Sequence, residues 1–147
     1  MHLFQDVFEF HRKFDLDRFG QTELSAEYGR PAVVAPHLLD EATQRFRENF
    51  MFEELDEFVA ACHDGDVAKA VDALTDLVWV ALGTAHMMHA PFDAVWAEVK
   101  RANMAKERAT GADDPRSVRK SALDVVKPAG WRPPDVERVL RDYGWTP

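Results

Sequence analysis

The sequence has one cysteine and no long apolar run. Because Cys62 is alone among 147 residues, no disulfide can form within the chain, which fits a reducing compartment; we expect a buried free thiol. The longest apolar stretch, residues 77–82, is far shorter than the ~20 residues that a membrane helix needs. The N-terminus is amphipathic and acidic, unlike a signal peptide. We therefore expect a soluble cytoplasmic protein with no membrane partner.

Basic residues are in the minority. The chain carries 26 Asp and Glu against 18 Lys and Arg, a net charge of −8. A protein that coats nucleic acid normally presents a basic face, so we expect no nucleic-acid partner. An acidic protein that acts on phosphates needs bound cations as intermediaries. The hydrophobic content of 46% in a chain of this length predicts one domain, residues 1–147, with a real core.

Glycine and proline separate segments with helical periodicity. The predicted helices span residues 2–14, 41–63, 67–89, 92–108 and 134–142. Asp40 is a plausible N-cap for the second helix, and Asp64 or Asp66 for the third. No segment alternates convincingly in the manner of a strand. The pattern therefore predicts an all-α fold: a four-helix bundle with an irregular C-terminal tail, residues 111–147, wrapping over it.

The second predicted helix carries carboxylates on one of its two apolar faces. Glu53, Glu54 and Glu57 are three and four residues apart, so they can converge. They share their face with Phe46 and Phe50. A helix that is apolar on two sides is expected to be central, which would place these carboxylates between helices. Spacing alone favours the alternative, a solvated acidic stripe.

The third predicted helix favours carboxylates that lie between helices over a solvated acidic stripe. Residues 73–85 read ALTDLVWVALGTA and are apolar all round except for Asp76 and two threonines, so we expect this helix to be buried. Burying a charged carboxylate in such a helix costs free energy of folding unless the carboxylate is paired or binds a cation. Asp72 lies one turn earlier on the same face, which Trp79 continues. The alternative is a buried Asp76 held by an arginine or a hydroxyl.

Two helices with inward carboxylates would form an oxygen-rich cage. Hard cations prefer such ligands, which indicates Mg²⁺, with Mn²⁺ as a possible substitute. These ions bridge phosphate oxygens and activate water, so the pattern indicates hydrolysis of phosphate esters or phosphoanhydrides. A di-iron centre would need Glu-x-x-His pairs on two helices, and the sequence has none.

Four further residues are candidates for substrate binding. Asn103 and Lys106 lie one turn apart on the fourth predicted helix. They could bind phosphate, or they could be a satisfied amide and a lysine whose stem covers apolar surface. His11 falls in the apolar stripe of the first helix, where a core or pocket-edge role is favoured over catalysis. Trp79 either packs in the core or forms the wall of a base pocket.

Longer segments resemble the MazG-like, phosphoribosyl-ATP pyrophosphohydrolase-like family. They are VFEFHRKFDL, RFRENFMFEELDEF, AVDALTDLVWVALGTA, PFDAVWAEVKRANMAKE and VVKPAGWRPPD. The resemblance covers roughly residues 5–135 and favours the phage and bacterial branch, so the expected location is the host cytoplasm if the protein is phage-encoded. It implies an all-α oligomer, a dimer or a tetramer. It also implies Mg²⁺-dependent cleavage of a nucleotide between the α and β phosphates, which yields the monophosphate and pyrophosphate.

The resemblance also implies metal ligands on two helices. The family's E-x-x-E corresponds to Glu54 and Glu57, with Glu53 beside them. Its E-x-x-D is half kept, because Asp76 matches the aspartate whereas Ala73 occupies the glutamate position. Asp72 then substitutes for that glutamate. The predicted metal ligands are Glu53, Glu54, Glu57, Asp72 and Asp76.

The remaining implied roles concern catalysis and the substrate. Either Glu53 or Glu54 is the catalytic base, and Asn103 and Lys106 match an N-x-x-K motif of the branch. The predicted substrate-binding residues are Asn103, Lys106, Trp79 and His11. The expected substrate is a (deoxy)nucleoside triphosphate, preferably dGTP or another deoxypurine triphosphate. Two alternatives remain: a pyrimidine substrate such as dCTP or dUTP, and a non-enzymatic helical interaction module.

Overall fold

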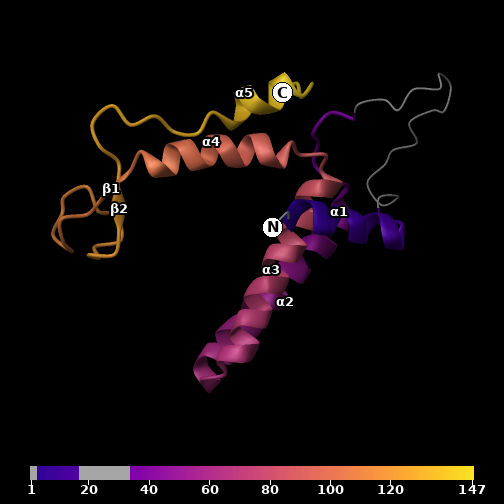
Figure 1. Cartoon of the computed structure of the whole chain (residues 1–147), viewed down its shortest axis with the longest axis horizontal. Helices are drawn as coiled ribbons and strands as arrows, with labels where there is room; N and C mark the ends of the chain where they lie inside the picture. The colour runs from indigo at the N-terminus through magenta and orange to yellow at the C-terminus, as the bar shows by residue number, and fades with distance from the viewer. Residues whose placement is uncertain (1–2, 17–33) are drawn as a thin grey trace. The chain divides into compact units, whose positions relative to one another are not determined.

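The computed structural model describes residues 3–16 and 34–147, and helices dominate this part of the chain (Figure 1). The helices are α1 (Leu3–Phe14), α2 (Glu41–Asp64), α3 (Val67–Met87), α4 (Phe92–Met104) and α5 (Val136–Asp142). Two short antiparallel strands, β1 (Glu107–Arg108) and β2 (Val125–Val126), pair with each other. The all-α prediction is confirmed. Among the described residues, no helix combines the length and apolarity that crossing a membrane requires.

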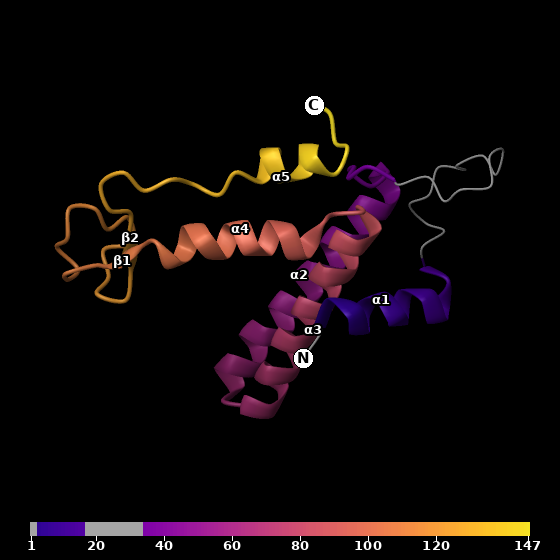
Figure 2. The same cartoon turned by 45° about the horizontal axis from the view of Figure 1, so that its top comes forward.

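Helices α2 and α3 form an antiparallel pair because local signals fix the turn between them. The carboxylate of Asp40 accepts a hydrogen bond from the backbone N–H of Thr43 at 3.0 Å and caps α2. Asp66 caps α3 in the same way through Lys69 N–H. Gly65, at φ +70°, supplies the left-handed residue that ends α2. The two helices consequently run side by side in both views (Figure 2).

Buried positions recur every seven residues along this pair, as they do in a coiled coil. They include Arg47, Glu54 and Ala61 on α2 and Ala73, Val80 and Met87 on α3. We call these positions the seam. Both Arg47 and Glu54 are only 8% exposed, so two charged side chains occupy positions that are normally apolar.

Helix α1 contacts α3 through a small buried face. Val7 and His11 are its buried residues, and the ring of His86 on α3 meets Phe8 and His11 edge-on, each at a centroid distance of 5.1 Å. Gly83 lies where α1 approaches α3: a methyl group there would fall 2.6 Å from Nε2 of His11. The absence of a side chain at Gly83 therefore allows this contact.

The chain divides into two compact units, residues 1–92 with Pro147 and residues 93–146. The described helices of the first unit are α1, α2 and α3, whereas α4 belongs to the second unit with the strands and α5. The grouping of the four predicted helices into one bundle stays a prediction. The single-domain organisation over residues 1–147, with the tail covering the bundle, stays a prediction.

Burial of the third helix departs from expectation. The apolar run of residues 73–85 predicts a buried helix, yet Leu74 and Val78 within it are 42% and 47% exposed. The prediction is wrong for a single chain because α2 and α1, which pack against α3, leave part of its circumference open. Cys62 is also exposed rather than buried.

The second unit contains an ordered segment between its two strands. Asp114 and Asp124 are buried carboxylates that organise this segment. Oxygens of Asp124 accept hydrogen bonds from Ser117 Oγ at 2.8 Å and from Arg119 Nη1 at 2.7 Å. Trp131 Nε1 donates to the carbonyl of Ala102 at 2.7 Å and ties the following segment to α4.

Candidate active site

Glu54 is the centre of a group of carboxylates on α2 and α3. Burial raises the pKa of Glu54, and four neighbouring negative charges raise it further. In decreasing order of effect they are Asp76, Glu57, Glu53 and Asp72. The group therefore contains all five predicted metal ligands and draws on both helices. Glu54 alone is buried, whereas the other four are exposed in the single chain.

Asp76 does not lie in the enclosed position that its apolar surroundings predict. Because α3 is open on one side, Asp76 is exposed, and the expectation of a buried carboxylate is wrong for the single chain. In the described ranges, no hydrogen bond or ion pair joins the five carboxylates to an arginine or a hydroxyl. The alternative of an Asp76 held structurally by an arginine therefore finds no support in that part of the chain.

The chemistry of this group suits a hard divalent cation. Its donors are carboxylate oxygens, which Mg²⁺ and Mn²⁺ prefer. Burial raises the pKa of Glu54 and repulsion from the neighbouring carboxylates raises it further, and a bound cation would relieve that repulsion. Within residues 3–16 and 34–147, no three His, Cys, Asp or Glu side chains are arranged to hold a metal ion as they stand. Binding would therefore require these side chains to turn towards one another.

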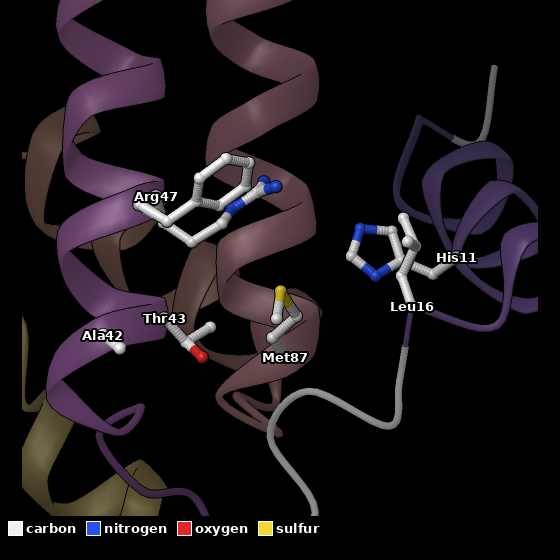
Figure 3. A pocket seen from close by; sticks show the side chains of 7 residues that line it. His11, Leu16, Ala42, Thr43, Arg47 and Met87 are labelled. Carbon is white, nitrogen blue, oxygen red and sulfur yellow. The ribbon is translucent and has the colours of Figure 1, made fainter.

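A pocket of about 440 Å³ opens near the N-terminal end of α2 (Figure 3). It is lined by His11, Leu16, Ala42, Thr43, Phe46, Arg47 and Met87. His11, a predicted substrate-binding residue, is 2% exposed and lies at this pocket. Trp79 lies elsewhere: its ring meets Phe10 of α1 edge-on at 5.4 Å.

Arg47 is a pocket residue that the sequence analysis missed. Its Nε donates to Thr84 Oγ1 at 3.0 Å and its Nη2 to the carbonyl of Val80 at 2.7 Å. Burial lowers the pKa of Arg47. The sequence did contain a signal for Arg47. This arginine precedes Glu54 by seven residues, about two helical turns, so the two side chains share a face of the helix.

Asn103 and Lys106 meet each other, as their spacing predicts. Lys106 Nζ donates to Asn103 Oδ1 at 2.8 Å, and its ammonium lies 5.8 Å from the centre of the Trp131 ring. Both residues belong to the second unit. Their role towards a substrate held by the first unit stays a prediction.

A comparison with known protein families matches the part of the chain that carries the five carboxylates. The family model described as phosphoribosyl-ATP pyrophosphohydrolase matches residues 22–103, which is more than half of the chain. The match includes the five carboxylates, Arg47 and Asn103, whereas His11 and Lys106 lie outside it. No curated protein matches the chain.

Proposed function

Because this chain belongs to the phosphoribosyl-ATP pyrophosphohydrolase family, whose members are hydrolases of phosphoanhydride bonds, we propose that it cleaves a (deoxy)nucleoside triphosphate between the α and β phosphates. The products are the monophosphate and pyrophosphate, the cofactor is Mg²⁺, and the preferred substrate is dGTP or another deoxypurine triphosphate. The observation that carries this proposal is the group of carboxylates from α2 and α3 around Glu54.

Five carboxylates would hold the cofactor: Glu53, Glu54, Glu57, Asp72 and Asp76. MazG-like pyrophosphohydrolases generally depend on divalent metals, and the donors here are oxygens, which favour Mg²⁺. When bound by these residues, the cations would offset the negative charge of the phosphates. The protein's own contribution is to keep acidic side chains of two helices next to one another before substrate arrives.

Glu53 or Glu54 acts as the general base in this proposal. Glu54 is suited to the role because its raised pKa makes it a better proton acceptor than an ordinary carboxylate. The glutamate takes a proton from a water molecule as the water oxygen forms a bond to the α-phosphorus. The bond from the α-phosphorus to the bridging oxygen breaks, and pyrophosphate leaves with that electron pair. Lys106, from this chain or a neighbouring subunit, offsets charge on the phosphates.

We also propose that the active form is an oligomer, a dimer or a tetramer. Support comes from a stripe of exposed apolar side chains on both helices of the pair, which we call the open stripe. Its members recur at helical spacing: Phe52, Leu55 and Val59 on α2 and Val67, Val71, Leu74 and Val78 on α3. A second copy of the chain would cover such surfaces, which isolated proteins seldom expose.

A panel of nucleotides, assayed for pyrophosphate, tests the proposed activity. We expect pyrophosphate and monophosphate from dGTP in Mg²⁺ or Mn²⁺, and no turnover in excess chelator. Orthophosphate without pyrophosphate would refute the assigned bond, and full activity in chelator would refute the metal requirement. Preferential turnover of dCTP or dUTP would instead favour the pyrimidine alternative, and inactivity on every nucleotide would favour a non-enzymatic module.

A further inference from the structure

Arg47 is a buried cation whose hydrogen bonds, in the described part of the chain, go to neutral acceptors and to no carboxylate. Its hydrogen-bond acceptors, Thr84 Oγ1 and the Val80 carbonyl, are both neutral. Among the described residues no carboxylate forms an ion pair with it, and the cause of its lowered pKa is burial alone. A guanidinium in this situation is expensive to bury, which points to a role beyond joining α2 to α3.

The guanidinium keeps hydrogen-bonding capacity for a ligand. It has five N–H donors, and its two hydrogen bonds, to Thr84 and Val80, occupy two of them. Arg47 and His11 both line the pocket, and Figure 3 shows the side chain of Arg47 reaching from α2 towards α3 and that of His11 reaching from α1 towards α3. The remaining donors are therefore placed to meet acceptors on a bound molecule.

The rest of the pocket suits a flat aromatic group. Phe46, Met87, Leu16 and Ala42 provide apolar walls, and about 440 Å³ lies within the usual range for small-ligand sites. A planar ring can pack on such walls while its polar edge meets the arginine. A nucleobase has this combination of an apolar face and a polar edge.

The pocket also lies at a suitable distance from the carboxylates. Arg47 precedes Glu54 by seven residues on the same buried face of α2, a separation of about 10 Å along a helix. An extended nucleotide spans a comparable distance from its base to its phosphates. A substrate whose phosphates meet the carboxylates around Glu54 can thus reach the pocket with its base.

Resting on the proposed function, we propose that this pocket binds the base of the nucleotide and that Arg47 is a specificity-determining residue for guanine. Guanine presents two adjacent acceptors, O6 and N7, which an arginine can meet with two parallel hydrogen bonds. Adenine has N7 but carries an amino donor at position 6, which would oppose the guanidinium. Arg47 therefore selects dGTP over dATP.

Base analogues test this assignment on the unaltered protein. Compared with dGTP, dITP keeps O6 and N7, 7-deaza-dGTP lacks N7, and dATP lacks O6. We expect kcat/KM for dITP close to that for dGTP, and values about tenfold or more lower for 7-deaza-dGTP and dATP. Equal values for dGTP and 7-deaza-dGTP would overturn the pocket assignment alone. Absence of pyrophosphate from every nucleotide would overturn the proposed function as well.

Arg47→Met supplies the second arm, with Arg45→Met as its control. Arg45 is an exposed arginine on the same helix, paired with Glu41, so its loss should leave all rates unchanged. Arg47→Met should lower kcat/KM for dGTP by roughly tenfold to a hundredfold while changing that for dATP little. An equal fall for every nucleotide would show that Arg47 is only structural. If Arg47→Met fails to fold, the base analogues decide the question.

Discussion

At the scale of single residues, the seam of α2 contains two charges that are accommodated in different ways. Arg47 donates to two neutral oxygens of α3, whereas Glu54 has its pKa raised by burial and by neighbouring carboxylates. Neither arrangement favours helix pairing, because buried charges cost several kcal/mol that apolar residues would not. Burial of these two charges therefore fits the ligand-binding roles that we propose for both residues.

Asp76→Asn is expected to abolish pyrophosphate release while leaving the metal-free protein folded and no less stable. The amide keeps the shape of the side chain but removes a negative charge that acts on Glu54. Thermal melting without metal, beside a turnover assay, measures both effects. Asp56→Asn is the matched control: Asp56 is an exposed aspartate on α2 outside the predicted ligands, and this variant should stay active.

The opposite result for Asp76→Asn would indicate a structural carboxylate. Removing one partner of a buried ion pair costs about 3–5 kcal/mol. A metal-free mutant that melts much earlier, yet turns over substrate when folded, would contradict the assignment of Asp76 as a metal ligand.

At the scale of elements, the contact between α1 and α3 depends on a glycine. A methyl group on Gly83 would lie 2.6 Å from His11 Nε2 and 2.9 Å from Arg47 Nη2, both too close for van der Waals contact. Either both side chains move or the helices separate. Since both side chains line the pocket, the geometry of the pocket depends on this one position.

Gly83→Ala should therefore destabilise the protein despite improving helix propensity. Alanine gains about 1 kcal/mol over glycine within a helix, whereas overpacking costs about 1–3 kcal/mol, so we expect a net loss of roughly 1 kcal/mol. Urea unfolding measures it. Gly111→Ala is the control, because a methyl group there meets nothing within 4 Å. A more stable Gly83→Ala protein with unchanged substrate selection would contradict the close contact.

The segment between β1 and β2 should respond to acid through Asp124. Hydrogen bonds from Ser117 and Arg119 lower the pKa of Asp124 from 3.8 to about 2. A carboxylate with a depressed pKa stabilises the fold above its unfolded pKa, and this contribution is lost as pH falls. Amide exchange in residues 107–126 should therefore accelerate as pH falls from about 3.8 towards 2, relative to the exchange of an unstructured chain. Asp124→Asn should weaken this dependence, and an unchanged profile would contradict the role of Asp124.

At the scale of the whole molecule, the α2–α3 pair has two distinct surfaces. The seam holds the carboxylate Glu54 and the guanidinium of Arg47, whereas the open stripe presents apolar side chains to solvent in the single chain. Burial of apolar area is the main favourable term in association. Self-association through the open stripe, as proposed above, would bury the apolar residues of α3 that a single chain leaves exposed.

Val71→Glu in the open stripe should convert an oligomer into a monomer. Light scattering at micromolar concentration should give a multiple of 16.7 kDa for the unaltered protein and about that mass for the variant, because a buried charge opposes association. Val118→Glu, at an exposed valine of the second unit, should leave the oligomer intact. An unaltered protein that is monomeric and fully active would refute self-association.

Features that depend on near neighbours were predictable from the sequence. Asp40 and Gly65 cap the two ends of α2, and such caps can be predicted because they act within one turn of the helix. Glu53, Glu54 and Glu57 lie close together because residues three and four apart share a helix face. Asp72 and Asp76 share a face of α3 because they are four residues apart. The short turn between α2 and α3 makes the two helices neighbours, and both aspartates act on the pKa of Glu54.

Features that depend on which helices meet could be decided only by the tertiary structure. The sequence marks Asp76 and Leu74 as parts of an apolar helix, yet both are exposed, because burial depends on how many partners surround α3. Arg47 reads as an ordinary surface arginine until α3 supplies its acceptors and α1 closes the pocket with His11. Spacing along one helix determines which side chains share a face, whereas contacts between distant segments determine whether that face meets water, a neighbouring helix or a ligand.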